Sequence, residues 1–215
     1  MRPEGKRGRF ITFEGGEGAG KSTQARLLAQ SLAARGIPVT LTREPGGTTG
    51  AEAIRALLLD PEAEWSPRVD AMLFAAARGD HVARLIEPAL ADGEWVVCDR
   101  YVDSSRAYQA GHGELDDHDV LTLHGVGSHG LMPDITFLLE AADEAVQARL
   151  LARDGDVSDR IGGRDSAYHA RVAERFRELA ASEPARIVRV DATGSVEDVH
   201  SRILQSMAKY VGEGE

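Results

Sequence analysis

A glycine-rich segment near the N-terminus, GGEGAGKST from Gly15 to Thr23, follows the apolar run RFITFE directly. Its glycines and the Lys21-Ser22 pair match the spacing G-x-x-x-x-G-K-S of a loop that wraps phosphates. Backbone N–H groups of such a loop point at the β-phosphate, and the helix expected near Lys21 adds the positive end of its dipole. We expect Lys21 to bridge the β- and γ-phosphates and the hydroxyl of Ser22 to bind Mg²⁺. The residues expected to bind the nucleotide are Gly15, Gly16, Glu17, Gly18, Ala19, Gly20, Lys21, Ser22 and Thr23.

The segment EWVVCDR supplies a second candidate for binding the metal. Asp99 follows a continuous apolar run, which is typical of a central strand in a parallel sheet. At the carboxyl end of such a strand a carboxylate can hold a Mg²⁺-bound water, and Arg100 can reach an anionic ligand. The alternative is that Asp99 caps the next helix. The expected metal-binding residues are thus Ser22 and Asp99.

These residues need a scaffold in which strands and helices alternate. Short apolar runs rich in β-branched and aromatic residues recur between stretches of helical period. We expect strands at 10–13, 37–41, 95–98, 135–139 and 187–190. Such alternation favours a mainly parallel sheet covered on both faces. The predicted fold is α/β: a three-layer, P-loop NTPase-like, five-stranded parallel sheet with helices on both faces and a short mobile lid.

Two of the connecting helices are predicted in more detail. Between Ser22 and Arg35 the apolar residues fall on one face, and Gly36 is placed to end the helix. In WSPRVDAMLF, Ser66 is a suitable N-cap with Pro67 at the first helical position. The stripe on that second helix, expected to pack mostly into the core, consists of Val69, Met72, Leu73 and Ala76.

The composition limits the classes of protein to which the chain can belong. With 215 residues, 42% of them apolar, it can form a single α/β domain over 1–215 and is short for two. The net charge of −10 argues against non-specific binding of nucleic acid, which needs clustered Lys and Arg. No apolar run approaches the roughly 18 residues of a membrane helix. The single cysteine, Cys98, fits a reducing cytoplasm, and residues 1–9 are expected to be a flexible arm.

The region 152–166, ARDGDVSDRIGGRDS, contains three arginines, four aspartates and three glycines. Its composition alone favours a solvated loop. Its position between two helical stretches, late in a phosphate-binding domain, points instead to a mobile lid.

Several classes of protein share the phosphate-binding loop. A GTPase would need a guanine-reading N-K-x-D segment, which this sequence lacks. The length and the arginine-rich lid fit a small kinase whose acceptor is another small molecule. Beyond the loop, segments in this order resemble the thymidylate kinase family: FEGGEGAGKSTQ, TREPGGT at 42–48, FAAAR at 74–78, DRYVDSSRAYQ at 99–109, PDITFLLE at 133–140 and DR at 159–160.

This resemblance extends from about residue 10 to the DAT segment at 191–193. It implies a cytoplasmic enzyme that transfers the γ-phosphoryl group of ATP to dTMP, giving dTDP and ADP, with Mg²⁺ as cofactor. It also implies a homodimer, for which the helix from Ser66 is a candidate contact. Neither a nucleic acid nor a membrane is expected as a partner.

The resemblance also assigns roles in acceptor binding to matching positions. Phe74 resembles the aromatic residue on which the thymine lies, and Arg78 the arginine that binds the base edge; stacking of this kind is worth about 1–3 kcal/mol. Arg43 and Arg100 resemble the pair that holds the acceptor phosphate, which suits two planar guanidinium groups. Glu17 resembles an acid that contacts the sugar 3′-OH. The residues expected to bind the acceptor are Glu17, Arg43, Pro45, Phe74, Arg78, Arg100, Ser105, Tyr108 and Gln109.

Alternatives stay open at several of these positions. Phe74 is also explained as a core residue, Arg78 as a surface arginine, and Ser105 as part of an ordinary helix start. Two positions depart from the family pattern. Asp80 stands where the family usually has an amide, and would place an acid beside the base pocket. Gly162-Gly163 stand where the lid of the family often has a glutamate.

A positioned arginine commonly stabilises the negative charge of a phosphoryl group in the transition state of its transfer. Some members of the family place that arginine inside the phosphate loop, but here the corresponding residues are Gly18 and Ala19. We therefore expect Arg153 and Arg160 of the lid to supply this positive charge, and Arg164 is the third candidate. The residues expected to act in catalysis are Lys21, Arg100, Arg153, Arg160 and Glu17.

Two other functions are weighed against this one. A P-loop kinase for another nucleoside monophosphate or small phosphorylated acceptor would differ in the acceptor that it turns over. A non-catalytic nucleotide-binding regulator would lack the groups on the acceptor side, so the presence of Arg43, Phe74, Arg78 and Arg100 argues against it.

Overall fold

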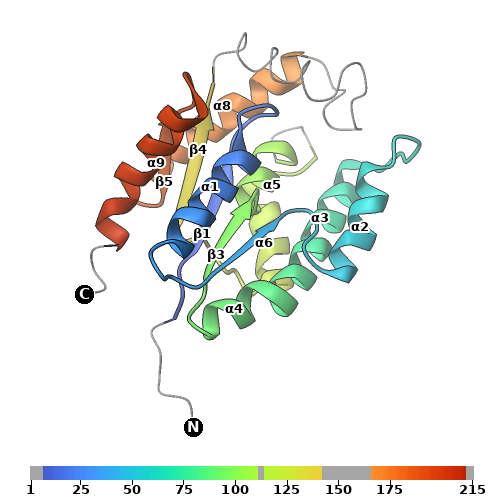
Figure 1. Ribbon diagram of the computed structural model, residues 1–215. Helices are drawn as coiled ribbons and strands as arrows, with labels where there is room; N and C mark the ends of the chain where they lie inside the picture. The colour runs from blue at the N-terminus through green and yellow to red at the C-terminus, as the bar shows by residue number, and fades with distance from the viewer. Residues whose placement is uncertain (1–6, 111–113, 142–165, 212–215) are drawn as a thin grey trace.

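The computed structural model describes residues 7–110, 114–141 and 166–211 of the chain (Figure 1). Five parallel strands form one sheet in the order β2-β3-β1-β4-β5. The strands are β1 (Phe10–Glu14), β2 (Val39–Arg43), β3 (Trp95–Asp99), β4 (Ile135–Glu140) and β5 (Ile187–Asp191). Each of the five predicted runs overlaps a strand, and the predicted α/β fold is confirmed.

The strand β2 begins two residues later than predicted. The N–H of Ile37 donates to the carbonyl of Leu32 at 3.1 Å, so this residue still belongs to the turn that ends the first helix. Pro38 has no N–H to give to the sheet, although its carbonyl accepts from the N–H of Trp95 at 2.8 Å. The regular ladder with β3 therefore starts at Val39, which pairs with Trp95.

Helices cover both faces of the sheet and complete the three layers (Figure 1). On one face, α1 (Lys21–Ala33) and α9 (Val196–Val211) share an apolar core with the strands, including Leu28, Ile203 and Phe137. The other described helices are α2 (Thr49–Leu59), α3 (Pro67–His81), the π-helix η1 (Val82–Ile86), α4 (Glu87–Ala91), α5 (Val102–Tyr108), α6 (Asp117–Ser128) and α8 (Ser166–Ser182). On the other face of the sheet, side chains of α5, α8 and the segment from η1 to α4 pack against Phe10 and Leu138.

The register of the sheet brings the carboxyl ends of three strands together. Asp99 pairs with Phe13 of β1 on one side and with Arg43 of β2 on the other. The loops that follow β1, β2 and β3 therefore start side by side at one edge. In open parallel sheets this edge is where ligands bind.

The helix α3 differs from its prediction in the face that it buries. Ser66 caps it by accepting from the N–H of Val69, with Pro67 at the first position, as expected. The predicted apolar stripe, however, does not pack into the core, because Val69 is 38% and Met72 52% exposed. The side chains that α3 buries are instead those of Asp70, Ala71, Ala75, Ala77, Arg78 and His81.

Small residues explain this orientation of α3. A Cβ on Gly79 would lie 2.8 Å from the carbonyl oxygen of Gly127 in α6, so the two helices approach closely along their glycines. Contact through glycine and alanine leaves the larger apolar side chains of α3 facing outward. The expectation that this stripe packs into the core was therefore wrong.

Residues 7–9 do not form a flexible arm, so that part of the expectation was also wrong. Arg7 makes two hydrogen bonds of 3.0 Å to Glu87, and the N–H of Gly8 donates to the carbonyl of Leu90 at 2.9 Å. Residues 1–6 lie outside the described residues, as does the expected lid except for Ser166, where α8 begins. In the described ranges no helix is both long and apolar enough to cross a membrane.

Candidate active site

The phosphate-binding loop joins β1 to α1, as its motif requires. Gly15 is buried with φ 135°, and a Cβ there would lie 2.4 Å from the carbonyl oxygen of Leu139, so only glycine fits. Lys21 begins α1, and its Nζ donates to the carbonyl oxygen of Gly16 at 2.6 Å. Burial, and after it the charge of Arg100, lower the pKa of Lys21 to about 8. An anion in the loop would therefore gain a nearby, poorly solvated ammonium group.

The two predicted metal-binding residues meet at this loop. The hydroxyl of Ser22 donates to Oδ2 of Asp99, while Oδ1 of Asp99 is buried and has no hydrogen-bond partner among residues 7–110, 114–141 and 166–211. The alternative role of Asp99 as a helix cap was wrong, because α5 starts at Val102 and its N-cap residue is Tyr101.

This pair of oxygen donors fits Mg²⁺. A hydroxyl and a carboxylate are hard ligands, and Mg²⁺ is commonly held by one or two protein groups together with substrate phosphates. Within the described residues no group of three or more His, Cys, Asp and Glu side chains could hold a metal. A metal at this place would therefore depend on the phosphates of a bound nucleotide for its remaining ligands.

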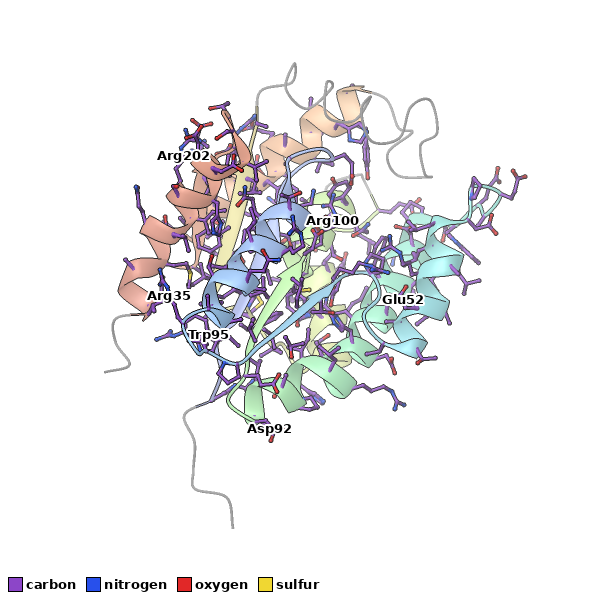
Figure 2. The ribbon with its side chains drawn as sticks, in the orientation of Figure 1. Arg35, Glu52, Asp92, Trp95, Arg100 and Arg202 are labelled. Atoms are coloured by element: carbon purple, nitrogen blue, oxygen red, sulfur yellow. The ribbon has the colours of Figure 1, made fainter. Side chains whose placement is uncertain are left out.

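Arg100 lies at the centre of the site, between the phosphate loop and α5 (Figure 2). Its backbone has φ 68°, which aims the side chain back toward the loop. Its Nη1 donates to Oγ of Ser104 at 3.0 Å and to the carbonyl oxygen of Gly15 at 3.2 Å. Its Nη2 forms an ion pair with Glu17, and the guanidinium carbon lies 5.2 Å from the centre of the Tyr108 ring. Glu17 thus has the arginine partner that an acid in this loop requires.

Glu14, which the sequence interpretation missed, binds the backbone that follows Arg100 and the side chain of Ser104. It ends β1, is fully buried, and accepts hydrogen bonds from the N–H of Tyr101 (2.8 Å) and from the N–H and Oγ of Ser104 (3.1 and 2.6 Å). Burial, and after it the carboxyl group of Asp103, raise its pKa to about 7 against the opposing effect of Arg100. The available signal was a glutamate at the end of an otherwise apolar strand.

A cleft of about 680 Å³ continues from the phosphate loop toward α3 and α5. Phe74 is half-buried and lines it, so the alternative of a core residue was wrong. Arg78 also lines the cleft but is only 3% exposed, so it is not a surface arginine. Its Nε donates to Glu44 and its Nη2 to Oγ of Ser105, both at 2.8 Å.

The helix α5 supplies the opposite wall. Ser105 lies inside the helix with its hydroxyl on Arg78, so it is not part of a helix cap. Tyr108 is 6% exposed and lines the cleft beside Arg100. Oε1 of Gln109 is buried and has no hydrogen-bond partner in the described part of the chain, so this amide offers an acceptor to a ligand.

The segment after β2 closes the third side of the cleft. Arg43 is exposed and pairs with Glu52 at 3.0 Å, and Pro45 follows in a bend of the backbone. Arg55 of α2, which sequence reasoning missed, donates to the carbonyl oxygen of Pro45 at 2.7 Å and also lines the cleft. Its signal was weak, because an arginine on an amphipathic helix is usually a solvated residue.

Asp80 does not lie beside the base pocket, so that expectation was wrong. Its carboxylate accepts from the hydroxyl of Thr48 at 2.5 Å and from Nε of Arg84 at 2.6 Å, and Asp80 is not among the residues that line the cleft. The lid residues Arg153, Arg160 and Arg164, with Gly162-Gly163, lie outside the described residues. Their roles stay predictions.

Comparison with known proteins identifies relatives along nearly the whole chain. A family model described as thymidylate kinase matches residues 13–203. A thymidylate kinase from Rhizorhabdus wittichii is 54% identical over 202 residues, covering 94% of this chain and 97% of that protein. One from Rhodopseudomonas palustris is 48% identical and covers 94% and 89%. A crystal structure of thymidylate kinase from Ehrlichia chaffeensis superposes with a TM-score of 0.76 at 29% identity, covering 94% of this chain and 99% of that one.

Proposed function

The chain belongs to the thymidylate kinase family, and we propose that it transfers the γ-phosphoryl group of ATP to dTMP, giving dTDP and ADP. The observation that carries this proposal is the continuity of one cleft. A phosphate loop with Lys21 stands at one end, and an aromatic and arginine pair, Phe74 and Arg78, stands at the other. Arg100 lies between them, where a phosphoryl group would pass from donor to acceptor.

On the donor side, the backbone of residues 15–20 and the ammonium group of Lys21 would bind the β- and γ-phosphates of ATP. Lys21 would exchange its bond to the Gly16 carbonyl for phosphate oxygens. Mg²⁺ would be held by the Ser22 hydroxyl and, through water, by Asp99. When bound, the metal neutralises charge on the phosphates.

On the acceptor side, Arg43 and Arg100 would hold the phosphate of dTMP from two directions. Both are long guanidinium side chains at the carboxyl edge of the sheet, and two planar forks suit a dianion. Each now pairs with a carboxylate, Glu52 and Glu17 respectively. The acceptor phosphate would compete for these arginines, which leaves the Glu17 carboxylate available to accept a hydrogen bond from the sugar 3′-OH.

The thymine ring would lie against Phe74, with its edge toward Arg78 and Gln109. An arginine donates only, and therefore matches a keto oxygen of the base. The buried Oε1 of Gln109, which no described residue binds, matches the imino N–H beside that oxygen. Tyr108, which lines the cleft, would lie next to the sugar.

We also propose that the enzyme is a homodimer that uses the outward face of α3. Val69 and Met72 on α3 and Val126 on α6 are 38%, 52% and 80% exposed. Large exposed apolar side chains on two packed helices favour a protein partner, and a second copy of the chain offers the same face. A cytoplasmic location follows from the resemblance and stays a prediction.

The acceptor identity is tested by ADP formation in a coupled assay with dTMP, dUMP, dCMP and UMP. We expect dTMP to give the highest kcat/KM of the four. A higher kcat/KM for another monophosphate would favour a kinase for a different acceptor. ATP binding without turnover of any of them would favour a nucleotide-binding regulator.

A further inference from the structure

A buried chain of hydrogen bonds lies behind the wall of the cleft that Arg78 forms. Oε2 of Glu44 accepts from Nε of Arg78 at 2.8 Å, and Oε1 of the same carboxylate lies 3.1 Å from Nδ1 of His81. Nε2 of His81 lies 2.7 Å from the hydroxyl of Thr42. Glu44 is 6% exposed and His81 is fully buried.

The donors and acceptors in this chain can be assigned from chemistry. Glu44 faces a guanidinium group and therefore accepts on both oxygens, so Nδ1 of His81 carries a proton and donates. Nε2 of a neutral His81 then accepts from the hydroxyl of Thr42. The turn after Pro45 seals the chain, since a Cβ on Gly47 would lie 2.5 Å from Oγ1 of Thr42 and 2.6 Å from Nε2 of His81.

These buried hydrogen bonds leave one nitrogen of Arg78, Nη1, for a ligand. Nε is bound by Glu44, and Nη2 donates to Oγ of Ser105 and, at 3.4 Å, to the carbonyl oxygen of Tyr101. Within the described part of the protein, Nη1 has no hydrogen-bond partner. A guanidinium group fixed at Nε and Nη2 cannot rotate, so the direction of its Nη1 hydrogens is fixed too.

We propose that Glu44 and His81 are positioning residues that hold the Arg78 guanidinium rigid. The rigid guanidinium then sets the preference between pyrimidines, favouring a base with a keto oxygen over one with an amino group at the edge that Arg78 faces. The inference deepens the proposed function and rests on it. An amino group cannot accept a hydrogen bond from Arg78. A base with an amino group at this edge would therefore leave the Nη1 donor of a rigid Arg78 desolvated and unpaired. A guanidinium freed from Glu44 could turn away, and the penalty against the amino base would fall.

Two substitutions of His81 separate this role from simple packing. In His81→Asn the amide nitrogen takes the place of Nδ1 and can still donate to Glu44. In His81→Gln the amide takes the place of Nε2, so the bond to Thr42 can remain while the donor to Glu44 is lost. Asp80→Asn is the matched control, because Asp80 neighbours His81 on α3 but binds Thr48 and Arg84.

The measurement is the Kd of dTMP and of dCMP by calorimetry, with KM for ATP and kcat on dTMP beside it. We expect His81→Gln to weaken dTMP about tenfold, the effect of one lost buried hydrogen bond, while dCMP changes less than about twofold. The ratio of the two Kd values then narrows about five- to tenfold. His81→Asn and Asp80→Asn should stay within about threefold of the wild type, and KM for ATP should not move.

Equal losses in His81→Gln for dTMP, dCMP and ATP would overturn the proposal, as would equal effects of the Asn and Gln variants. If His81→Gln fails to fold, Glu44→Gln takes its place, and the same ratio of the Kd values of dTMP and dCMP is measured for that variant. Failure of both variants to fold would mean that the pair serves the core alone, and would also contradict the proposal. Failure of the wild type to bind dTMP would instead refute the proposed function, so the two failures are distinguishable.

Discussion

Glu14 offers the sharpest test of how the site is built, because its carboxyl group is buried at the end of β1 beneath Arg100. Its pKa is raised from 4.5 to about 7, first by burial and then by Asp103, while Arg100 and the bonds from Ser104 and Tyr101 oppose the change. We expect Glu14→Gln to remove a pH dependence from the stability of the protein. The amide oxygen can still accept from the N–H groups of Tyr101 and Ser104, so the fold should survive.

The magnitude follows from the two pKa values. Between pH 4.5 and 7 the unfolded chain loses the Glu14 proton while the folded protein keeps it, so the unfolding free energy of the wild type falls as pH rises. One pKa unit corresponds to 1.36 kcal/mol, so a rise from 4.5 to about 7 corresponds to about 3 kcal/mol. This loss develops through the window between the two values and is complete above the folded pKa.

The assay is urea unfolding followed by circular dichroism, at steps from pH 4.5 to 8, for the wild type and Glu14→Gln. We expect the wild-type free energy minus that of the variant to fall by about 3 kcal/mol across this range. Glu64→Gln makes the same chemical change at an exposed position and serves as control. A difference between the wild type and Glu14→Gln that stays constant, or that rises with pH, would refute the reasoning.

Three further substitutions test other parts of the site. Asp99→Asn should lower kcat at least about tenfold and raise the Mg²⁺ concentration needed, with the Kd of dTMP kept; turnover unchanged across a Mg²⁺ titration would remove Asp99 from the metal site. Phe74→Ala should raise KM for dTMP about tenfold, in line with loss of a stacking contact, and leave KM for ATP in place; equal changes in both would return Phe74 to a packing role. Met72→Lys should shift the mass in sedimentation equilibrium toward the monomer, and an unchanged mass would place the dimer contact elsewhere.

The strands and the phosphate loop could be predicted from sequence because their signals are local. A parallel strand buried on both faces reads as a short apolar run, and the loop between β1 and α1 needs glycine and lysine at fixed spacing. Asp99 and Arg100 followed from the same logic, since they directly follow an apolar strand. Phe74 and Arg78 came from the family resemblance, not from any local pattern.

What could not be predicted depends on contacts between distant segments. The outward face of α3 is set by glycine contact with α6, so an apolar stripe alone pointed to the wrong face. Glu44 and His81 are 37 residues apart and gain meaning only when α3 meets the turn after β2. Asp80 is adjacent to the site in sequence but faces Thr48, because successive residues on a helix point in different directions.

We expect the protein to transfer a phosphoryl group from ATP to dTMP, with both nucleotides bound in one cleft. The most direct test is the amount of dTDP and ADP formed from ATP, Mg²⁺ and dTMP by the purified protein, separated by ion-exchange chromatography. We predict one dTDP for each ADP, and far less ADP when dTMP is omitted. ADP formed without dTDP, or ATP left intact in the presence of dTMP, would contradict the claim.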